Sequence, residues 1–203
     1  MKATIKFIAL GTLLGALSAC EEGEPTIYTQ PEPSYAQAMR DNTGTYTISL
    51  GALDEVCISA YASVATTTTP IGSARSNVAD ITLSVNDTDS YFYEYTTVFN
   101  GATDDRTSAA NILNVDPASI TYTTLYLDTE RSSTGEPTAI YIEDSSGDGS
   151  YRLTASPYYM VKFAIGEITS TGFTGGFEAH KETPLGSSCQ YFFDSATFTA
   201  VKQ

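Results

Sequence analysis

The acidic residues between positions 144 and 149 are spaced like the start of a calcium-binding loop. Asp144, Ser146 and Asp148 match positions 1, 3 and 5 of such a loop, and Gly149 matches its sharp turn. The twelfth position, where a bidentate acid completes the coordination of calcium, is Ala155. The flanking segments also resemble strands rather than the helices of this motif. We therefore expect a hairpin corner, and a weak calcium site is the alternative.

Three tyrosines alternate along the segment at 90–99. Tyr91, Tyr93 and Tyr95 occupy every second position, so in a strand their rings lie on one face. Such a row can stack on sugar rings or contact a protein partner, because tyrosine combines a large apolar area with a polar tip. Core packing explains the same spacing more simply. The three tyrosines are the first binding residues to test.

The sequence offers little that is typical of catalysis. His180 is the only histidine, and it lies beside Lys181 and Glu182 at the end of a strand-like segment. A metal centre built from several histidines is excluded, no Gly-x-Ser-x-Gly elbow is present, and we expect a solvated loop histidine. A pair of carboxylates of the glycosidase kind stays open, because such partners meet only in the fold. We predict no catalytic residue and no cofactor.

A cluster of glycines lies near the C-terminus. Gly172, Gly175 and Gly176 are interleaved with Phe173 and Phe177. No Lys-Ser/Thr follows them and no helix is predicted to begin there, so they do not form a phosphate loop. Glycines within a strand pattern are typical of a bulge or bend, and the two phenylalanines are predicted to lie in the core.

The elements that must position these residues are predicted to be strands. Thr, Tyr, Val, Ile and Phe are frequent, and turn residues interrupt the chain about every ten positions. Apolar and polar residues alternate, which favours antiparallel sheets with one face in water. The predicted strands lie at 45–50, 55–64, 78–85, 90–99, 119–128, 138–143, 151–155, 158–166, 170–179 and 190–201, with a short helix at 107–114.

This pattern predicts a single all-β domain. About ten strands without a repeat of fixed period favour an antiparallel β-sandwich or a small closed β-barrel of about 8–10 strands. Alternation is the same in both architectures, so it does not choose between them.

The N-terminus has the pattern of an export signal. Lys2 and Lys6 accompany an apolar run that ends at Leu17, and the run is shorter than the roughly 20 residues of a membrane-spanning helix. The tetrapeptide Leu-Ser-Ala-Cys that ends at Cys20 resembles the lipobox of bacterial lipoproteins. The resemblance covers residues 1–20. It implies a signal peptide over 1–19 and a diacylglyceryl group on the thiol of Cys20.

The resemblance also implies a location. Glu21 lies where an Asp tends to retain such lipoproteins in the inner membrane, so we expect an outer-membrane anchor facing the periplasm or the cell surface. Residues 20–40 contain three prolines among acidic and polar residues. They are expected to form an extended tether to a β domain at 41–203. A short helix over 34–41 is the alternative.

The two remaining cysteines and the net charge predict a disulfide and limit the kinds of partner. With Cys20 lipidated, Cys57 and Cys189 form an even pair in an oxidising compartment, and we expect a disulfide between them. The formal charge of −14 argues against nucleic acid as a partner. The sequence therefore predicts a lipoprotein whose noncatalytic β domain is structural or binds a protein or glycan partner. A small secreted hydrolase that uses acidic residues and a lipocalin-like binder of a small ligand are the alternatives.

Overall fold

The computed structural model describes residues 32–61, 66–86, 93–100, 105–121, 125–144, 154–155 and 158–203. Its helices are α1 (Tyr35–Asp41), α2 (Asp105–Leu113) and the 3-10 helix η1 (Pro117–Ser119). Its strands are β1 (Gly44–Leu50), β2 (Leu53–Ser59), β3 (Thr67–Gly72), β4 (Arg75–Asn86), β5 (Glu94–Asn100), β6 (Ile120–Thr121), β7 (Leu125–Arg131), β8 (Pro137–Asp144), β9 (Thr154–Ala155), β10 (Tyr158–Thr169), β11 (Gly172–Lys181) and β12 (Cys189–Lys202).

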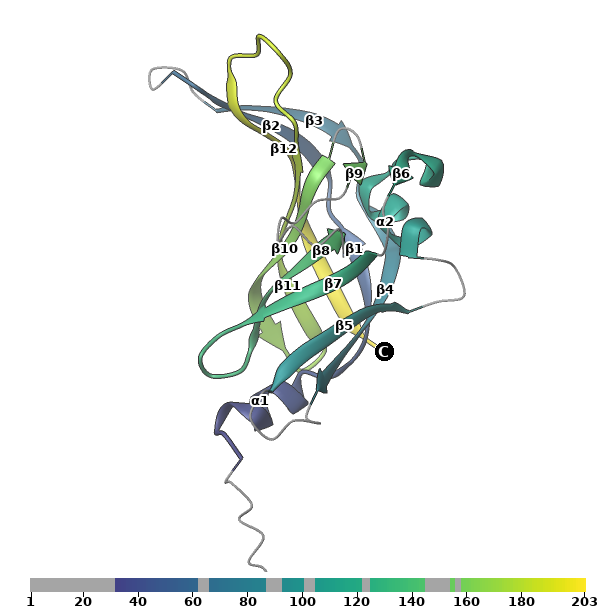
Figure 1. Cartoon of the computed structure of the whole chain (residues 1–203), viewed down its shortest axis with the longest axis vertical. Helices are drawn as coiled ribbons and strands as arrows, with labels where there is room; N and C mark the ends of the chain where they lie inside the picture. The colour runs from purple at the N-terminus through teal and green to yellow at the C-terminus, as the bar shows by residue number, and fades with distance from the viewer. Residues whose placement is uncertain are drawn as a thin grey trace, which may run out of the picture. The chain divides into compact units, whose positions relative to one another are not determined.

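Eight of these strands close into an antiparallel barrel (Figure 1). The order around the barrel is β1, β4, β5, β7, β8, β10, β11 and β12, and β12 pairs back with β1. Barrel strands that are neighbours in space also follow one another along the chain, so the topology is an up-and-down meander. The prediction of a single all-β antiparallel domain is confirmed, and the architecture is the closed barrel rather than the sandwich.

The first barrel strand continues past the barrel. Residues Phe198–Lys202 of β12 pair with β1, whereas Cys189–Ser195 of the same strand pair with β2. β1 and β2 are therefore successive halves of one long strand that is interrupted at Gly51. The N–H of Gly51 donates to the carbonyl oxygen of Thr197 at 2.8 Å, and a Cβ at Gly51 would collide with the Thr197 side chain.

β3 and β4 run alongside this long strand, because β3 pairs with β2 and β4 pairs with β1. We call β2, β3 and residues 189–195 of β12 the sheet extension. It lies at the opposite end of the barrel from α1 (Figure 1). β3 was not predicted, because its sequence TTTPIG lacks alternation, and all six of its residues are exposed.

Aromatic side chains fill the barrel interior. The ring of Phe163 lies 5.2 Å from the rings of both Phe177 and Phe198, and the ring of Tyr46 lies 4.3 Å from that of Phe173. All five side chains are buried. Small barrels are commonly filled by inward side chains in this way. The phenylalanines at 173 and 177 are core residues, as expected.

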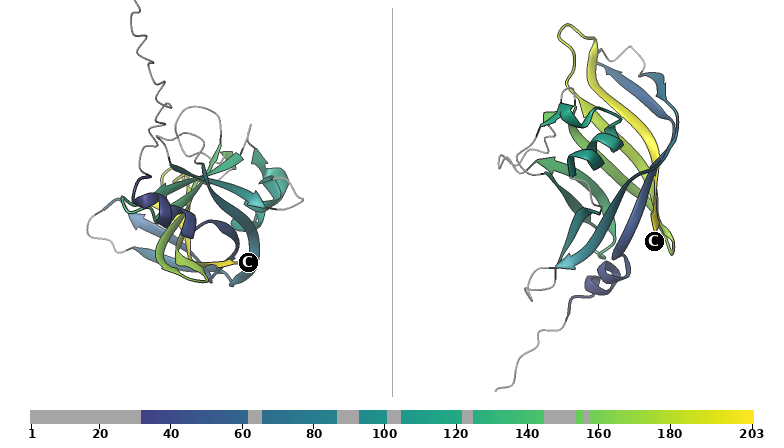
Figure 2. Two further views of the ribbon diagram at one scale, coloured as in Figure 1. Left: turned by 90° about the horizontal axis from the view of Figure 1, so that it is seen from below. Right: turned by 90° about the vertical axis from the view of Figure 1, so that its right-hand side faces the viewer.

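α1 closes one end of the barrel (Figure 2, left). Its residues Ala36 and Met39 are fully buried, and Met39 belongs to the same apolar cluster as the barrel interior. The hydroxyl of Tyr46 donates to the carbonyl oxygen of Asn42, just after the helix, at 2.6 Å. The compact part of the chain starts at Glu32. Residues 35–41 adopt a short helix, which was the alternative to an extended tether in this segment.

α2 confirms the helix expected at 107–114. It buries Ala109, Ala110, Ile112 and Leu113. The Arg75 guanidinium at the start of β4 donates to the carbonyl oxygens of Asn111 and Ile112, at 2.5 and 2.8 Å. A cation that binds the last carbonyls of a helix satisfies groups without an intrahelical partner and favours the helix dipole. Across the described ranges, no helix is long and apolar enough to cross a bilayer.

Candidate functional site

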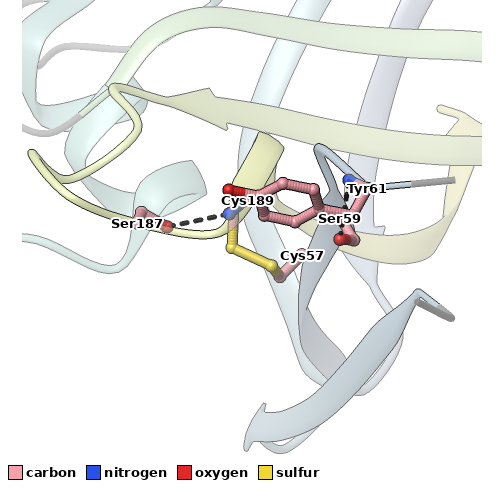
Figure 3. Close-up of a disulfide and its surroundings, with 5 residues drawn as sticks. All are labelled: Cys57, Ser59, Tyr61, Ser187 and Cys189. Atoms are coloured by element: carbon pink, nitrogen blue, oxygen red, sulfur yellow. Dashed lines mark hydrogen bonds between the residues drawn. A yellow bond between two sulfur atoms is a disulfide. The ribbon is translucent and has the colours of Figure 1, made fainter. Parts of the chain in front are cut away.

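The disulfide predicted between Cys57 and Cys189 is present and braces the sheet extension (Figure 3). The two Cα atoms lie 5.4 Å apart. Next to the bond, the N–H of Ala60 donates to the carbonyl oxygen of Ser188 at 2.8 Å, and the N–H of Cys189 donates to Ser187 Oγ at 3.0 Å. The end of β2 and the turn before β12 are thus held together covalently and by hydrogen bonds.

Large apolar side chains are exposed on this braced region. Leu185, in the turn before β12, is completely exposed, and the exposed fractions of Tyr61 and Tyr191 are 66% and 50%. We call Tyr61, Leu185 and Tyr191 the tip residues. Single exposed apolar residues are ordinary. These three are distinguished by their place beside one disulfide, within four positions of Cys57 or Cys189 in the sequence.

The inner face of the sheet extension carries a buried network of charges. Lys181 Nζ lies 2.5 Å from Asp194 Oδ1 and 3.0 Å from Glu55 Oε2. The Tyr158 hydroxyl donates to Asp194 Oδ2 at 2.6 Å. The strand register brings these residues together, because Asp194 pairs with Glu55 on one side and Tyr158 pairs with Lys181.

The environment of the network decides its chemistry. Burial, followed by the hydrogen bond to Asp194 and the negative charge of that residue, raises the pKa of the Tyr158 hydroxyl. Tyr158 is therefore a neutral hydrogen-bond donor at physiological pH. Asp194 Oδ2 accepts the hydrogen bond from Tyr158, and the buried Oδ1 makes an ion pair with Lys181 but no hydrogen bond. The Lys181 ammonium lies between two carboxylates. None of these groups is free to act as a nucleophile or a general base.

The same geometry bears on the hydrolase alternative. A glycosidase needs one carboxylic acid that is held protonated and a second carboxylate that faces the sugar. Asp194 and Glu55 instead share the ammonium of Lys181, and Asp194 is only 1% exposed. This carboxylate pair therefore does not have the arrangement that hydrolysis needs.

The expectation for His180 is wrong. Its ring is stacked on Phe193 with centroids 5.2 Å apart, and Nε2 lies 3.2 Å from the Glu178 carboxylate. Its side chain is only 16% exposed. The reason is that β11 continues through Lys181, so His180 lies opposite Phe193 in the sheet rather than in a loop.

Tyr93 and Tyr95, two of the three candidate tyrosines, lie at the other end of the barrel. Tyr95 is buried, and its hydroxyl donates to the carbonyl oxygen of Gly135 at 2.7 Å. The ring of Tyr93 lies edge-on to that of Tyr35, with centroids 6.2 Å apart. Core packing therefore describes Tyr95, and Tyr93 packs against the α1 end. Tyr91 lies outside the described residues.

The other candidate positions fall largely outside the described residues. Asp144 ends β8, whereas Ser146 and Asp148 are not described, and neither is Cys20. The described ranges contain no group of three His, Cys, Asp or Glu side chains arranged to hold a metal ion.

The charge network was missed at the level of sequence, although a signal was present. Asp194 is in phase with the inward residues Phe198 and Ala200, and Lys181 is in phase with Phe177 and Ala179. A charged residue on the apolar face of a strand requires a buried partner. The sequence did not show which residue is that partner, because Glu55 and Lys181 are 126 positions apart.

These features define an eight-stranded meander barrel with a helix at one end and a disulfide-braced extension at the other. No family model, no curated protein and no solved structure matches the chain.

Proposed function

We propose that this protein is an exported lipoprotein, anchored in the outer membrane through Cys20, that binds a protein partner through the tip residues. The observation that carries this proposal is the exposure of Tyr61, Leu185 and Tyr191 within a few residues of a disulfide that cross-links the end of β2 to the start of β12. A rigid surface loses little conformational entropy when it binds, so its apolar contacts contribute more fully to affinity. Tyrosine is also enriched among the residues that dominate binding energy.

The position of the N-terminal end of the fold supports a membrane anchor at Cys20. The compact part begins at Glu32 beside α1, at the opposite end from the sheet extension (Figure 1). Cys20 lies twelve positions earlier in the sequence, which limits the distance between the lipid and Glu32 to about 40 Å. An anchor at Cys20 would hold α1 near the membrane and leave the tip residues accessible. The disulfide also leaves Cys20 as the third, unpaired cysteine.

A noncatalytic role is supported by the buried charges. Tyr158, Lys181 and Asp194 satisfy one another, so the network orders the sheet extension rather than activating a substrate. Buried polar groups of this kind stabilise one arrangement of strands because any other arrangement leaves a charge unpaired.

The lipocalin-like alternative has one specific observation in its favour. Lipocalins are eight-stranded up-and-down barrels, and this chain has that strand order. The aromatic side chains that fill the interior of this barrel oppose a large ligand there. Titration with fluorescent fatty acids distinguishes small-ligand binding inside the barrel from partner binding at the tip residues. Only a barrel interior with room for the ligand gives saturable one-to-one binding.

The test of the leading proposal compares two sets of variants. A photo-reactive amino acid at Leu185 is expected to cross-link a discrete envelope protein in cells. The triple variant Tyr61→Ser, Leu185→Ser, Tyr191→Ser should lose capture of that protein at least tenfold at unchanged melting temperature. The control is Val98→Ser with Val201→Ser, which removes two apolar residues of the barrel wall whose exposed fractions are 50% and 55%. Equal losses in both sets, or no loss from the triple variant, would refute the proposal.

The anchor is tested separately. Mass spectrometry of the exported protein should find an N-terminal Cys20 that carries a diacylglyceryl group, and Cys20→Ala should move the protein from the membrane to the soluble fraction. An unmodified cysteine, or a mature chain that starts elsewhere, would contradict lipidation without affecting the tip.

A further inference from the structure

A second surface, on the side of the barrel, lies where β4 meets the end of α2. One open depression is lined by residues that include Asn77, Asn111 and Asn114. A second depression, lined by residues that include Thr47, Asp80 and Val201, also contains Asn77. Their volumes of about 380 and 440 Å³ lie within the range of small-molecule sites, roughly 300–1,000 Å³. Asn77 lines both depressions, which we together call the groove.

The backbone projects two of the asparagines into this groove. Asn77 and Asn114 have φ angles of 53° and 57°, and among the described residues no other non-glycine residue has a positive φ. Asn77 lies where the register between β1 and β4 shifts, and its N–H donates to Ser49 Oγ at 3.1 Å. Bulges of this kind re-aim side chains and are common next to binding sites. Asn114 directly follows α2.

The third asparagine is held in place by Arg75. Its guanidinium binds the carbonyl oxygens of Asn111 and Ile112 and so fixes the last turn of α2 beside the start of β4. All three asparagines are exposed. Within the part of the chain that the structure describes, their side-chain amides make no hydrogen bond to the protein. Each amide therefore retains two donors and an acceptor for a ligand.

The charged groups of the groove are already paired. Arg75 is engaged by α2, Asp80 accepts a hydrogen bond from Thr47 Oγ1 at 2.7 Å, and Lys202 Nζ donates to the carbonyl oxygen of Asp41 at 3.3 Å. A charged ligand would gain little from groups that have partners. A neutral ligand that both donates and accepts hydrogen bonds fits this lining best.

We propose that the groove formed by Asn77, Asn111, Asn114 and the hydroxyls beside them binds a neutral oligosaccharide. Sugar hydroxyls donate and accept, which matches the free amides. An extended peptide is a poorer fit, because it needs a free strand edge or apolar pockets, and β4 is paired with β1 and β5. Two depressions that share Asn77 offer room for more than one sugar unit.

The test follows the amides directly. A soluble form that starts after Cys20, labelled with ¹⁵N, is titrated with neutral hexasaccharides: maltohexaose, cellohexaose, laminarihexaose and xylohexaose. At least one is expected to cause saturable shifts of the side-chain amide signals of Asn77, Asn111 and Asn114. The amide of Asn42, which donates to the carbonyl oxygen of Ala38, should not shift. The affinity should not depend on salt, because no charge is recognised.

Three variants remove the amides with little change in structure. Asn77→Gly and Asn114→Gly keep the positive φ, and Asn111→Ala suits a helix. Each should lower affinity about three- to tenfold, the effect expected for one hydrogen bond, at unchanged melting temperature. Thr96→Ala, on the outer face of β5, is the control and should bind normally.

Three outcomes would overturn the proposal: no saturable shift with any of the four sugars, equal binding by the triple amide variant, or loss of sugar binding in the tip variant. The proposal does not rest on the role of the tip residues. Capture through Leu185 and sugar binding in the groove can each fail while the other succeeds.

Discussion

At the scale of single residues, the side chains around Asp194 show how the sheet extension acquires a definite structure. Burial of Asp194 and Lys181 removes two charges from water, and their ion pair and the Tyr158 hydrogen bond offset that cost. An apolar replacement of the whole network would be tolerated better than the loss of one member, because a single loss leaves a buried charge without its partner.

The burial of Tyr158 predicts that the free energy of unfolding falls at alkaline pH. Burial raises the pKa values of Tyr46, Tyr95 and Tyr158 in the folded protein. The unfolded tyrosines ionise near pH 10, so the stabilisation is complete below that pH and is lost as the pH rises above it. Each tyrosine should lower the free energy of unfolding by up to about 1.4 kcal/mol per pH unit there.

Urea denaturation between about pH 9 and 11.5 measures this effect. Tyr158→Phe should make the decline of the free energy of unfolding shallower, because one fewer proton is released on unfolding. Identical slopes for this variant and the wild type would show that the folded protein does not raise the pKa of Tyr158.

At the scale of elements, β11 depends on two adjacent glycines in different ways. A Cβ at Gly175 would collide with the carbonyl oxygen of Ala164 and with the ring of Phe198, while a Cβ at Gly176 meets nothing within 4 Å. The sequence predicted a bulge or bend at these glycines, and the β10–β11 register does shift between Ile165 and Glu167, opposite Gly175 and Thr174. Gly176 lies on the outer face, where there is room.

This difference yields a matched pair of variants. Gly175→Ala should lower the free energy of unfolding by about 1–3 kcal/mol, because β10 or Phe198 must move. Gly176→Ala should stay within about 0.5 kcal/mol of the wild type. Chemical denaturation of both proteins measures the difference, and equal stabilities would mean that β10 and β11 adjust without cost.

α1 is the second element with a testable role. Met39 is fully buried at the end of the barrel, and Gln37 is exposed on the same helix. Met39→Ala should lower the free energy of unfolding by about 2–5 kcal/mol, whereas Gln37→Ala should change it by less than about 0.5 kcal/mol. If both variants unfold like the wild type, α1 does not close the barrel in solution.

At the scale of the whole molecule, the disulfide joins residues 132 positions apart. In the chain-entropy model a loop of this length stabilises the folded state by about 5 kcal/mol. The double variant Cys57→Ala, Cys189→Ala should therefore lose up to that amount in urea denaturation, and reduction of the wild type should have the same effect. A loss below about 1 kcal/mol would indicate that the β2–β12 pairing persists without the bond.

Much of the fold was readable from the amino-acid pattern. Alternation along 45–50 and 78–85 predicted two of the barrel strands, and the short helix predicted at 107–114 is α2. The features that the sequence did not predict also have physical reasons. β3 has no alternation because both of its faces are exposed, and His180 was assigned to a loop because the end of β11 is set by its neighbours.

Local spacing along the chain thus predicted the all-β class, the helix at 107–114 and the pair of cysteines that forms the disulfide, since each depends on residues close together or on cysteine count. Closure of the sheet, the network of Glu55, Tyr158, Lys181 and Asp194, and the groove between β4 and α2 depend on which strand lies beside which. That choice is made by packing between segments more than a hundred residues apart, and no local pattern records it.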